Sequence, residues 1–244
     1  MDFVKIGIFS DVHGNLEALK KVFEVFENEG CSEIFNLGDT VSLGGYSKQC
    51  LDFVLSKKNC TNLLGNHDKD YVDNTYQQKP LSHTTTAHKL AVFDQLGDDY
   101  RQKVSQFKLY VEKDYFGLKV AFMHYALTGN PDWPFQNLAT TPSGEQFDQM
   151  FQFCPCDLIF FGHKHELCNV VGKTTKVYCD VGSAGCHPRN TAECVVLTIF
   201  ENKGYQLSRV AVPYDRLDNL KQMQRLNMPD SEYLFDFYYN RKDV

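Results

Sequence analysis

The chain has 244 residues, of which 43% are hydrophobic, and this is enough for a core of ordinary depth, so we expect one domain over residues 1–244. The net charge of −6 argues against a surface that follows nucleic-acid phosphates, and we expect no stable nucleic-acid partner. No apolar run approaches the length of a membrane span and the first residues do not resemble a signal peptide, so we expect a cytoplasmic protein without a membrane partner.

Residues 5–15 are expected to form the first buried strand and the loop that follows it. This stretch begins with a short apolar run, which predicts a buried strand, and it ends in a polar turn that contains a glycine. Asp11 and His13 lie in this turn, two residues apart. A carboxylate and an imidazole held together where a strand ends are typical of a metal site.

Two strand-helix-strand units follow in order. Apolar residues at helical spacing predict a helix from residue 16 to about Gly30, and short strands are expected over residues 33–37 and 60–64 with a second helix between them. The two strands end in Gly38-Asp39 and Gly65-Asn66-His67-Asp68. Successive crossovers of this kind are right-handed and give a largely parallel sheet, so we expect these polar clusters to meet at the carboxyl ends of the strands.

Residues 69–103 have a helical pattern, clearest over 84–96, where we expect Leu90, Phe93 and Leu96 to face the core. We then expect a hairpin over residues 107–115 and 118–123, a loop over 125–142, a helix over 143–153 and a strand over 157–161. The hairpin ends at His124, and the last strand runs directly into Gly162-His163-Lys164-His165.

The last third of the chain is rich in strands, followed by a helix and an aromatic tail. The strands are expected over residues 167–171, 174–179, 193–200 and 205–212, and the helix and tail over 213–244. The tail is too apolar for a free end, so we expect it either to pack back on the domain or to form a subunit contact in a homo-oligomer. Its aromatic residues are Tyr233, Phe235, Phe237, Tyr238 and Tyr239.

Nine polar residues each follow directly after a predicted strand. Any one of them alone would more often be a helix cap or a hydrogen-bonded histidine, but scattered surface residues would not be sorted in this way. Mixed imidazole and carboxylate ligands suit Mn, Fe, Zn, Co or Ni better than Ca or Mg. The set is Asp11, His13, Asp39, Asn66, His67, Asp68, His124, His163 and His165.

These motifs, taken in order from Asp11 to His165, resemble the calcineurin-like metallophosphoesterase superfamily. The resemblance implies an α/β fold, a four-layer αββα sandwich with two mixed sheets, and a centre of two divalent or trivalent metal ions, with Mn or Fe favoured. By position, one ion would be held by Asp11, His13 and His165, the other by Asn66, His124 and His163, and Asp39 would bridge them. His67 would act beside the site, oriented by Asp68.

Two metal ions in such a centre can share a hydroxide that attacks phosphorus in line. His67 is then expected to protonate the leaving oxygen or to stabilise the transition state. We therefore expect a metal-dependent hydrolase of a phosphodiester or a nucleotide-type phosphoanhydride, with a small phosphate ester or nucleotide as its substrate.

The stretch after Asp39 lacks the arginine of protein phosphatases and of symmetrical dinucleoside polyphosphate hydrolases. It looks more like the compact prokaryotic phosphodiesterase-like branch, which carries a segment similar to residues 182–189, although Asp180-Val181 replaces the usual Asn-Pro. Arg189 and Lys164 are then either phosphate contacts or solvated charges. The alternatives are an asymmetrical diadenosine tetraphosphate hydrolase, a phosphomonoesterase or protein phosphatase, and a scaffold without activity. A scaffold is free to lose metal ligands, and this chain keeps all seven expected ones, so the scaffold is the least favoured alternative.

Two further features leave alternatives open. Trp133 and Phe135 could stack on a nucleobase at the mouth of the site or anchor their loop on the core. The nine scattered cysteines, an odd number, are expected to be reduced and mostly buried thiols.

Overall fold

The computed structural model describes residues 2–73, 85–132, 134–137 and 142–239. Within these ranges the strands are β1 (Phe3–Phe9), β2 (Glu33–Asn36), β3 (Cys60–Asn62), β4 (Tyr110–Tyr115), β5 (Leu118–Met123), β6 (Leu158–Phe161), β7 (Leu167–Val171), β8 (Val177–Val181), β9 (Thr191–Phe200) and β10 (Tyr205–Pro213). The helices are α1 (Leu16–Glu29), α2 (Ser47–Ser56), α3 (Asn66–Asp73), α4 (Thr86–Val104), α5 (Gly144–Met150), α6 (Leu217–Arg225) and α7 (Ser231–Tyr239).

The strands form two mixed sheets of five, in the orders β10-β9-β1-β2-β3 and β4-β5-β6-β8-β7. In the first sheet β1, β2 and β3 are parallel, with Ile6 opposite Glu33, and β9 runs antiparallel to β1. In the second sheet β5, β6 and β8 are parallel, and β4 and β7 are antiparallel edge strands. The ends of the parallel strands β1, β2 and β3 therefore lie at one edge of the sheet, as expected from the sequence.

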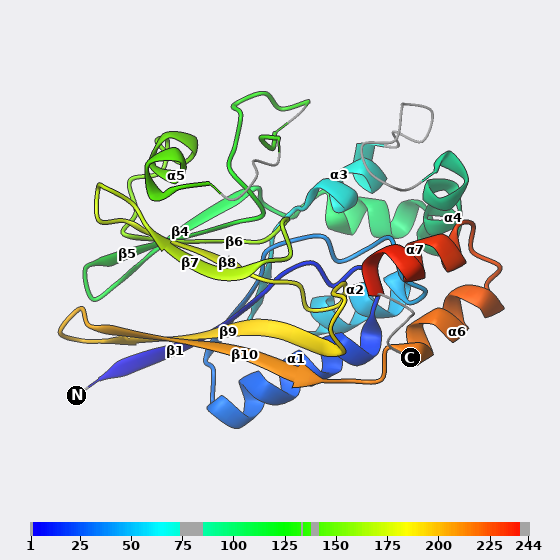
Figure 1. Cartoon of the computed structure of the whole chain (residues 1–244), viewed down its shortest axis with the longest axis horizontal. Helices are drawn as coiled ribbons and strands as arrows, with labels where there is room; N and C mark the ends of the chain where they lie inside the picture. Colours follow the sequence, from blue (N-terminus) through cyan, green and yellow to red (C-terminus); the bar gives the residue numbers. More distant parts are fainter. Residues whose placement is uncertain (1, 74–84, 133, 138–141, 240–244) are drawn as a thin grey trace.

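The two sheets pack face to face, and helices cover their outer faces (Figure 1). Between the sheets, the ring of Phe35 on β2 stacks on Phe122 of β5 with centroids 3.7 Å apart. Apolar residues of α1 and α2 pack under the first sheet, and Phe147 of α5 packs over the second. The chain is thus a four-layer αββα sandwich, as expected.

Helix α1 illustrates how local sequence fixes an element. The side chain of Asn15 accepts a hydrogen bond from the backbone N–H of Ala18 and caps the first turn. The helix ends at Gly30, whose φ of 71° is left-handed, a conformation that costs a glycine nothing. Its buried side chains, including Leu19 and Phe23, recur at helical spacing and face the sheet.

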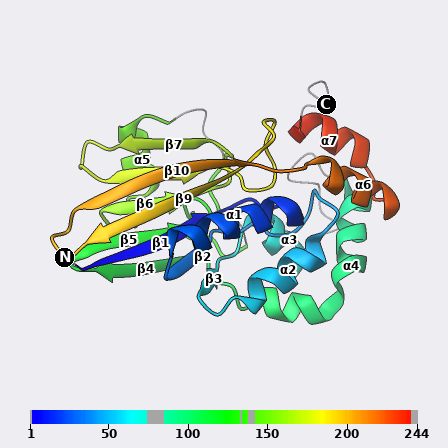
Figure 2. The same cartoon turned by 90° about the horizontal axis from the view of Figure 1, so that it is seen from below.

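Helices α3, α4, α6 and α7 lie together beyond the end of the first sheet where β1 and β2 finish (Figures 1 and 2). The tail expected after residue 226 forms α7 and packs back on the domain through Leu234, Phe235 and Tyr239, which are buried. The prediction for Leu90 was wrong, because its side chain is 45% exposed. The buried side of helix α4 carries His88, Val92 and Leu96, which are four residues apart. Leu90 therefore lies on the opposite side of the helix.

Some boundaries differ from those expected. β4 begins at Tyr110 rather than at residue 107, because Phe107 packs among the helices at the end of the molecule. β8 covers Val177–Val181, since a turn precedes it. All nine cysteines are free thiols, and six of them are buried, in line with the expectation for reduced cysteines.

Candidate metal centre

The predicted polar residues meet where the ends of β1, β2, β5 and β6 converge with the start of α3. Asp11 and His13 follow β1, Asp39 follows β2, and His124 follows β5. Asn66 is the first residue of α3, and His163 and His165 come after β6. These residues form two groups of candidate ligands. The first donor group is Asp11, His13 and His165, and the second donor group is Asn66, His124 and His163.

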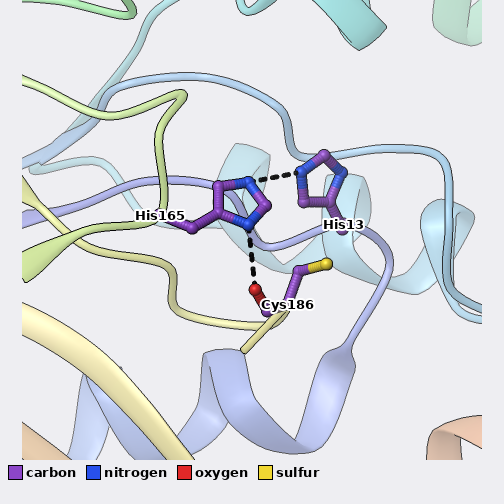
Figure 3. Close-up of side chains that lie close together, drawn as sticks. All are labelled: His13, His165 and Cys186. Carbon is purple, nitrogen blue, oxygen red and sulfur yellow. Dashed lines mark hydrogen bonds between the residues drawn. The ribbon is translucent and has the colours of Figure 1, made fainter. Parts of the chain in front are cut away.

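In the first donor group three ligand atoms face one another. His13 Nε2 lies 3.3 Å from His165 Nε2 and 3.6 Å from Asp11 Oδ1. His165 Nε2 lies 3.1 Å from the same Asp11 oxygen. The other ring nitrogen of His165, Nδ1, lies 2.9 Å from the backbone carbonyl of Cys186 (Figure 3). That carbonyl can only accept, so Nδ1 donates its proton and Nε2 is left to face the group.

The second donor group has the same construction. His124 Nε2 lies 2.9 Å from Asn66 Oδ1 and 3.2 Å from His163 Nδ1. His124 Nδ1 lies 3.2 Å from the backbone carbonyl of Leu37, to which it donates, so its Nε2 also faces the group. The amide orientation of Asn66 that presents its oxygen is the one a metal site requires.

The carboxylate of Asp39 lies between the two donor groups. Its Oδ2 is 3.4 Å from His124 Nε2 and 3.8 Å from His13 Nε2. Its Oδ1 accepts a hydrogen bond of 2.8 Å from the backbone N–H of His67. Asp39 is thus placed where one carboxylate can serve both groups.

These distances fit metal ions. Ligand atoms about 2.0–2.2 Å from a metal lie about 3–3.5 Å from one another, and the distances between facing atoms in the two groups run from 2.9 to 3.6 Å. The atoms that face each other are mostly lone-pair acceptors, so they repel unless a proton or a cation lies between them. The donor set, imidazole with carboxylate and one amide oxygen, is suited to transition metals.

The pKa values of the buried carboxylates and histidines also indicate that the carboxylates need positive charge beside them. Burial opposes ionisation of Asp39, but the imidazoles of His124 and His67 outweigh it and hold the pKa of this carboxyl well below its usual range. Burial likewise disfavours a charged His124, but Asp39 and other carboxylates raise its pKa to about 9. Asp11 and His165 shift in the same directions. The buried carboxylates therefore require cations as neighbours.

Five of these residues have left-handed backbones, which non-glycine residues rarely adopt. They are Asp11, His13, Asp39, His163 and His165, with φ between 49° and 72°. Two glycines let the backbone come close to the carboxylates of Asp39 and Asp11. A Cβ at Gly65 would lie 2.1 Å from Asp39 Oδ1, and one at Gly162 would lie 2.4 Å from Asp11 Oδ2. Backbone strain of this kind concentrates at functional sites.

His67 lies beside the centre, with its ring centroid 5.0 Å from that of His13. Burial lowers its pKa to about 4, so its imidazole is neutral near pH 7 and donates through N–H. The expectation that Asp68 orients His67 was wrong, because the Asp68 carboxylate accepts from the backbone N–H groups of Thr40, Val41 and Gly65. Asp68 instead holds the loop that carries Asp39.

The two candidate phosphate contacts have other partners. Arg189 is 67% exposed on its side chain and donates to Glu193 Oε1 at 2.6 Å. Lys164 pairs with Glu166 at 3.3 Å. Phe135 is buried in the core and its ring contacts that of His124, with centroids 5.3 Å apart, so it anchors its loop. Trp133 lies outside the described residues.

Three supporting residues were not identified as such from the sequence. Ser183 Oγ donates to the backbone carbonyl of Asp11 at 2.8 Å and accepts from the N–H of Cys186, also at 2.8 Å. Cys186 in turn orients His165 through its carbonyl. Asn15, expected only as a helix cap, also donates to the carbonyl of Gly185. The resemblance over residues 182–189 was the signal that marked this segment.

Comparisons with known proteins agree with this picture. Residues 4–167 match the family model described as Calcineurin-like phosphoesterase. An uncharacterised protein of Methanocaldococcus jannaschii is 28% identical over 246 residues, covering 92% of this chain and 94% of that protein.

Two solved structures share the fold. A hypothetical protein from Pyrococcus horikoshii matches with a TM-score of 0.78 at 14% identity, over 97% of this chain and 98% of that one. A metallophosphoesterase from Sphaerobacter thermophilus matches with a TM-score of 0.68 at 19% identity, over 93% and 96%. Among the described residues, no helix combines the length and apolar character needed to cross a membrane.

Proposed function

The chain belongs to the calcineurin-like phosphoesterase family and is a metal-dependent phosphoesterase, and on that premise we propose that it hydrolyses a phosphodiester or a nucleotide-type phosphoanhydride at a centre of two metal ions. The observation that carries the proposal is the Asp39 carboxylate, placed between two groups of inward-facing ligand atoms. The first donor group would hold one ion, the second donor group the other, and Asp39 would serve both.

When bound, two such ions supply Lewis acidity toward the phosphoryl oxygens and lower the pKa of water near neutrality. The residues of the chain set the charge of the centre. Its neutral imidazole and amide donors outnumber its two carboxylates, Asp11 and Asp39, so the loaded centre keeps a positive charge that attracts a phosphate anion. An acidic chain thus gains a local site for an anionic substrate.

His67 is the residue best placed to act on the substrate directly. One of its ring nitrogens lies within 4.8 Å of ligand atoms of His13 and Asp39, so His67 stands beside the first donor group. In this position it would donate a hydrogen bond to a phosphoryl or leaving-group oxygen as negative charge develops there.

A diester or anhydride is favoured over a phosphoprotein substrate by the loop after Asp39. Thr40, Val41 and Leu43 are buried in this loop, and it contains no arginine that could bind the phosphate of a protein side chain. A phosphomonoesterase and an asymmetrical diadenosine tetraphosphate hydrolase are the alternatives that the experiment must separate.

The test is hydrolysis by chelator-treated protein supplied with Mn, Fe(II), Zn, Co or Ni. The substrates are bis-p-nitrophenyl phosphate, p-nitrophenyl phosphate and diadenosine tetraphosphate. We expect hydrolysis of the diester or the dinucleotide to require added metal and to fall about 100-fold or more in His67→Ala. Protein that is fully folded and binds metal, yet is inert toward all three substrates, would contradict the proposal and favour a scaffold.

His88→Gln is the matched control for this test. His88 is a buried histidine whose two ring nitrogens are engaged by Leu43 N–H and the carbonyl of Pro229, outside both donor groups. Its replacement should leave the metal requirement and the choice among the three substrates as they are in the wild-type protein. A preference for p-nitrophenyl phosphate would identify a phosphomonoesterase instead.

A further inference from the structure

A cluster of thiol and carboxylate side chains lies at the edge of the second sheet and shares no residue with the candidate metal centre. Cys154 and Cys156 come from the loop between α5 and β6, and Glu112 comes from the edge strand β4. One ligand atom from each of the three lies within 4.8 Å of the other two. Among the described residues, every other group of this kind contains a ligand of the candidate metal centre. We call Cys154, Cys156 and Glu112 the thiol cluster.

The ligand atoms of the thiol cluster converge on one point, which is marked by the hydroxyl of Tyr110. Tyr110 and Glu112 are two residues apart on β4 and so lie on the same face of the strand. The Tyr110 hydroxyl donates to the Glu112 carboxylate. The same oxygen lies 3.4 Å from Cys154 Sγ and 4.0 Å from Cys156 Sγ. A single atom in contact with all three members shows that they face one another.

The loop that carries the two cysteines is held by contacts of its backbone. The N–H of Cys154 donates to the carbonyl of Phe151 at 2.9 Å, and the carbonyl of Cys154 accepts from Lys176 Nζ at 2.5 Å. Pro155, between the two cysteines, has a fixed φ and no N–H. An ion that bound both sulfur atoms would therefore not have to order a mobile segment first.

The thiols of the cluster do not ionise readily unless a cation lies beside them. Burial and the neighbouring Cys154 raise the pKa of the Cys156 thiol to about 12. Lys113, the next residue along β4, pairs with Glu33 rather than with the cluster. Both cysteines are buried, whereas Glu112 is exposed and connects them to solvent. A cation bound from that side would supply positive charge and allow the thiols to ionise.

We propose that the thiol cluster binds a zinc ion that ties the edge strand β4 to the loop before β6. Cys154 and Cys156 would supply two thiolate ligands and Glu112 a carboxylate oxygen, with water in the fourth tetrahedral position. Each thiol would release its proton to solvent as its sulfur–zinc bond forms. Two thiolates select soft or borderline metals, and the carboxylate favours Zn(II) over Cu(I). The inference goes beyond the proposed function and does not depend on it.

The test is titration of reduced, chelator-treated protein with Co(II), which replaces Zn(II) in tetrahedral sites. A thiolate bound to Co(II) adds a charge-transfer band in the near ultraviolet that nitrogen and oxygen ligands do not give. Cys186 lies beside His13 and His165, so the titration uses a Cys186→Ser chain, which keeps that thiol from contributing. We expect the band to appear with Co(II) and to disappear when Zn(II) displaces it.

Three variants in the same background locate the band. The double variant Cys154→Ser, Cys156→Ser should abolish it and lower the zinc content by about one ion per chain. Glu112→Gln keeps both thiols, so the band should persist while the affinity for Zn(II), measured by competition with an indicator dye, falls about tenfold or more. Cys168→Ser is the matched control, because Cys168 is a free thiol on β7 outside the cluster, and it should leave the band unchanged.

Cadmium-113 NMR of the unmodified chain is a second measurement, which serves if the double variant does not fold. We expect a resonance at the chemical shift of cadmium with two thiolate ligands. Three results would overturn the inference. They are folded, reduced protein that shows no thiolate band with Co(II), a band that survives in the folded double variant, and the absence of a two-thiolate cadmium resonance.

Discussion

The two donor groups do the same chemical task but are held in different ways. Every member of the first donor group has a left-handed backbone, whereas in the second only His163 does. Asn66 instead begins α3, and His124 directly follows β5. The first donor group therefore depends on contacts from distant loops, and the second depends mainly on where regular elements start and end.

The distant contacts of the first donor group come from the loop after β8. Ser183 binds the carbonyl of Asp11 and the N–H of Cys186, and the carbonyl of Cys186 orients His165. The second donor group takes its matching contact from the carbonyl of Leu37, directly after β2. Strain is tolerated in the first group because this surrounding loop fixes its geometry.

Asp39→Asn should have the largest effect, because it removes the one carboxylate common to both groups. We expect kcat/KM for the best substrate to fall by about 10³-fold or more and the metal content to drop below that of the wild-type protein. Steady-state kinetics and elemental analysis measure the two quantities. Full metal content with unchanged kinetics would show that Asp39 does not link the groups.

A matched pair of serine variants tests whether the first group depends on its loop. Ser183→Ala should lower metal affinity or kcat/KM by about 10- to 100-fold, the range found for residues that orient ligands. Ser10→Ala is the control, because Ser10 is equally buried but its hydroxyl has no protein partner among the described residues. Metal titrations of both variants should separate them, and equal losses would contradict the role given to Ser183.

Backbone strain predicts opposite orders of stability at two ligand histidines. At His13, with φ of 49°, the Gly variant should be more stable than the Ala variant by about 1 kcal/mol. At His124, which has no left-handed backbone, the Ala variant should be the more stable by about 0.5–1 kcal/mol. Urea unfolding of the four metal-free variants gives these values. The same order at both positions would refute the difference in strain.

His88, which lies outside both donor groups, should make the stability of the fold depend on pH. Burial lowers the pKa of His88, so the folded state favours the neutral ring while the unfolded state takes up a proton near pH 6.5. This group contributes stability above that pH and loses it as the pH falls. Thermal unfolding of metal-free protein between pH 7.5 and 5.5 should show a smaller decline in His88→Gln than in the wild type. An equal decline in both would exclude His88 as a contributor.

Much of the fold could be predicted from the sequence, because the signals are local. The spacing of apolar residues in α1, its cap Asn15 and its terminal Gly30 are readable within one segment. Leu90 was misplaced because α4 offers apolar residues on two faces, and only packing against Tyr71 and Met223 in the same cluster selects one. Asp68 was misassigned because a carboxylate next to a histidine in sequence says nothing about which backbone N–H groups the fold brings to it.

The order and types of the polar clusters, each at the end of a strand, were determined by the sequence alone, because parallel strands place their carboxyl ends at one edge. Only the tertiary structure decided which atoms face one another. His13 and His165 are separated by 152 residues, and Asp11 and Ser183 by 172. It also decided that the aromatic tail is a helix that packs back on the domain through Leu234, Phe235 and Tyr239. Contacts between segments so distant in sequence arise from packing of the whole chain, which no local pattern contains.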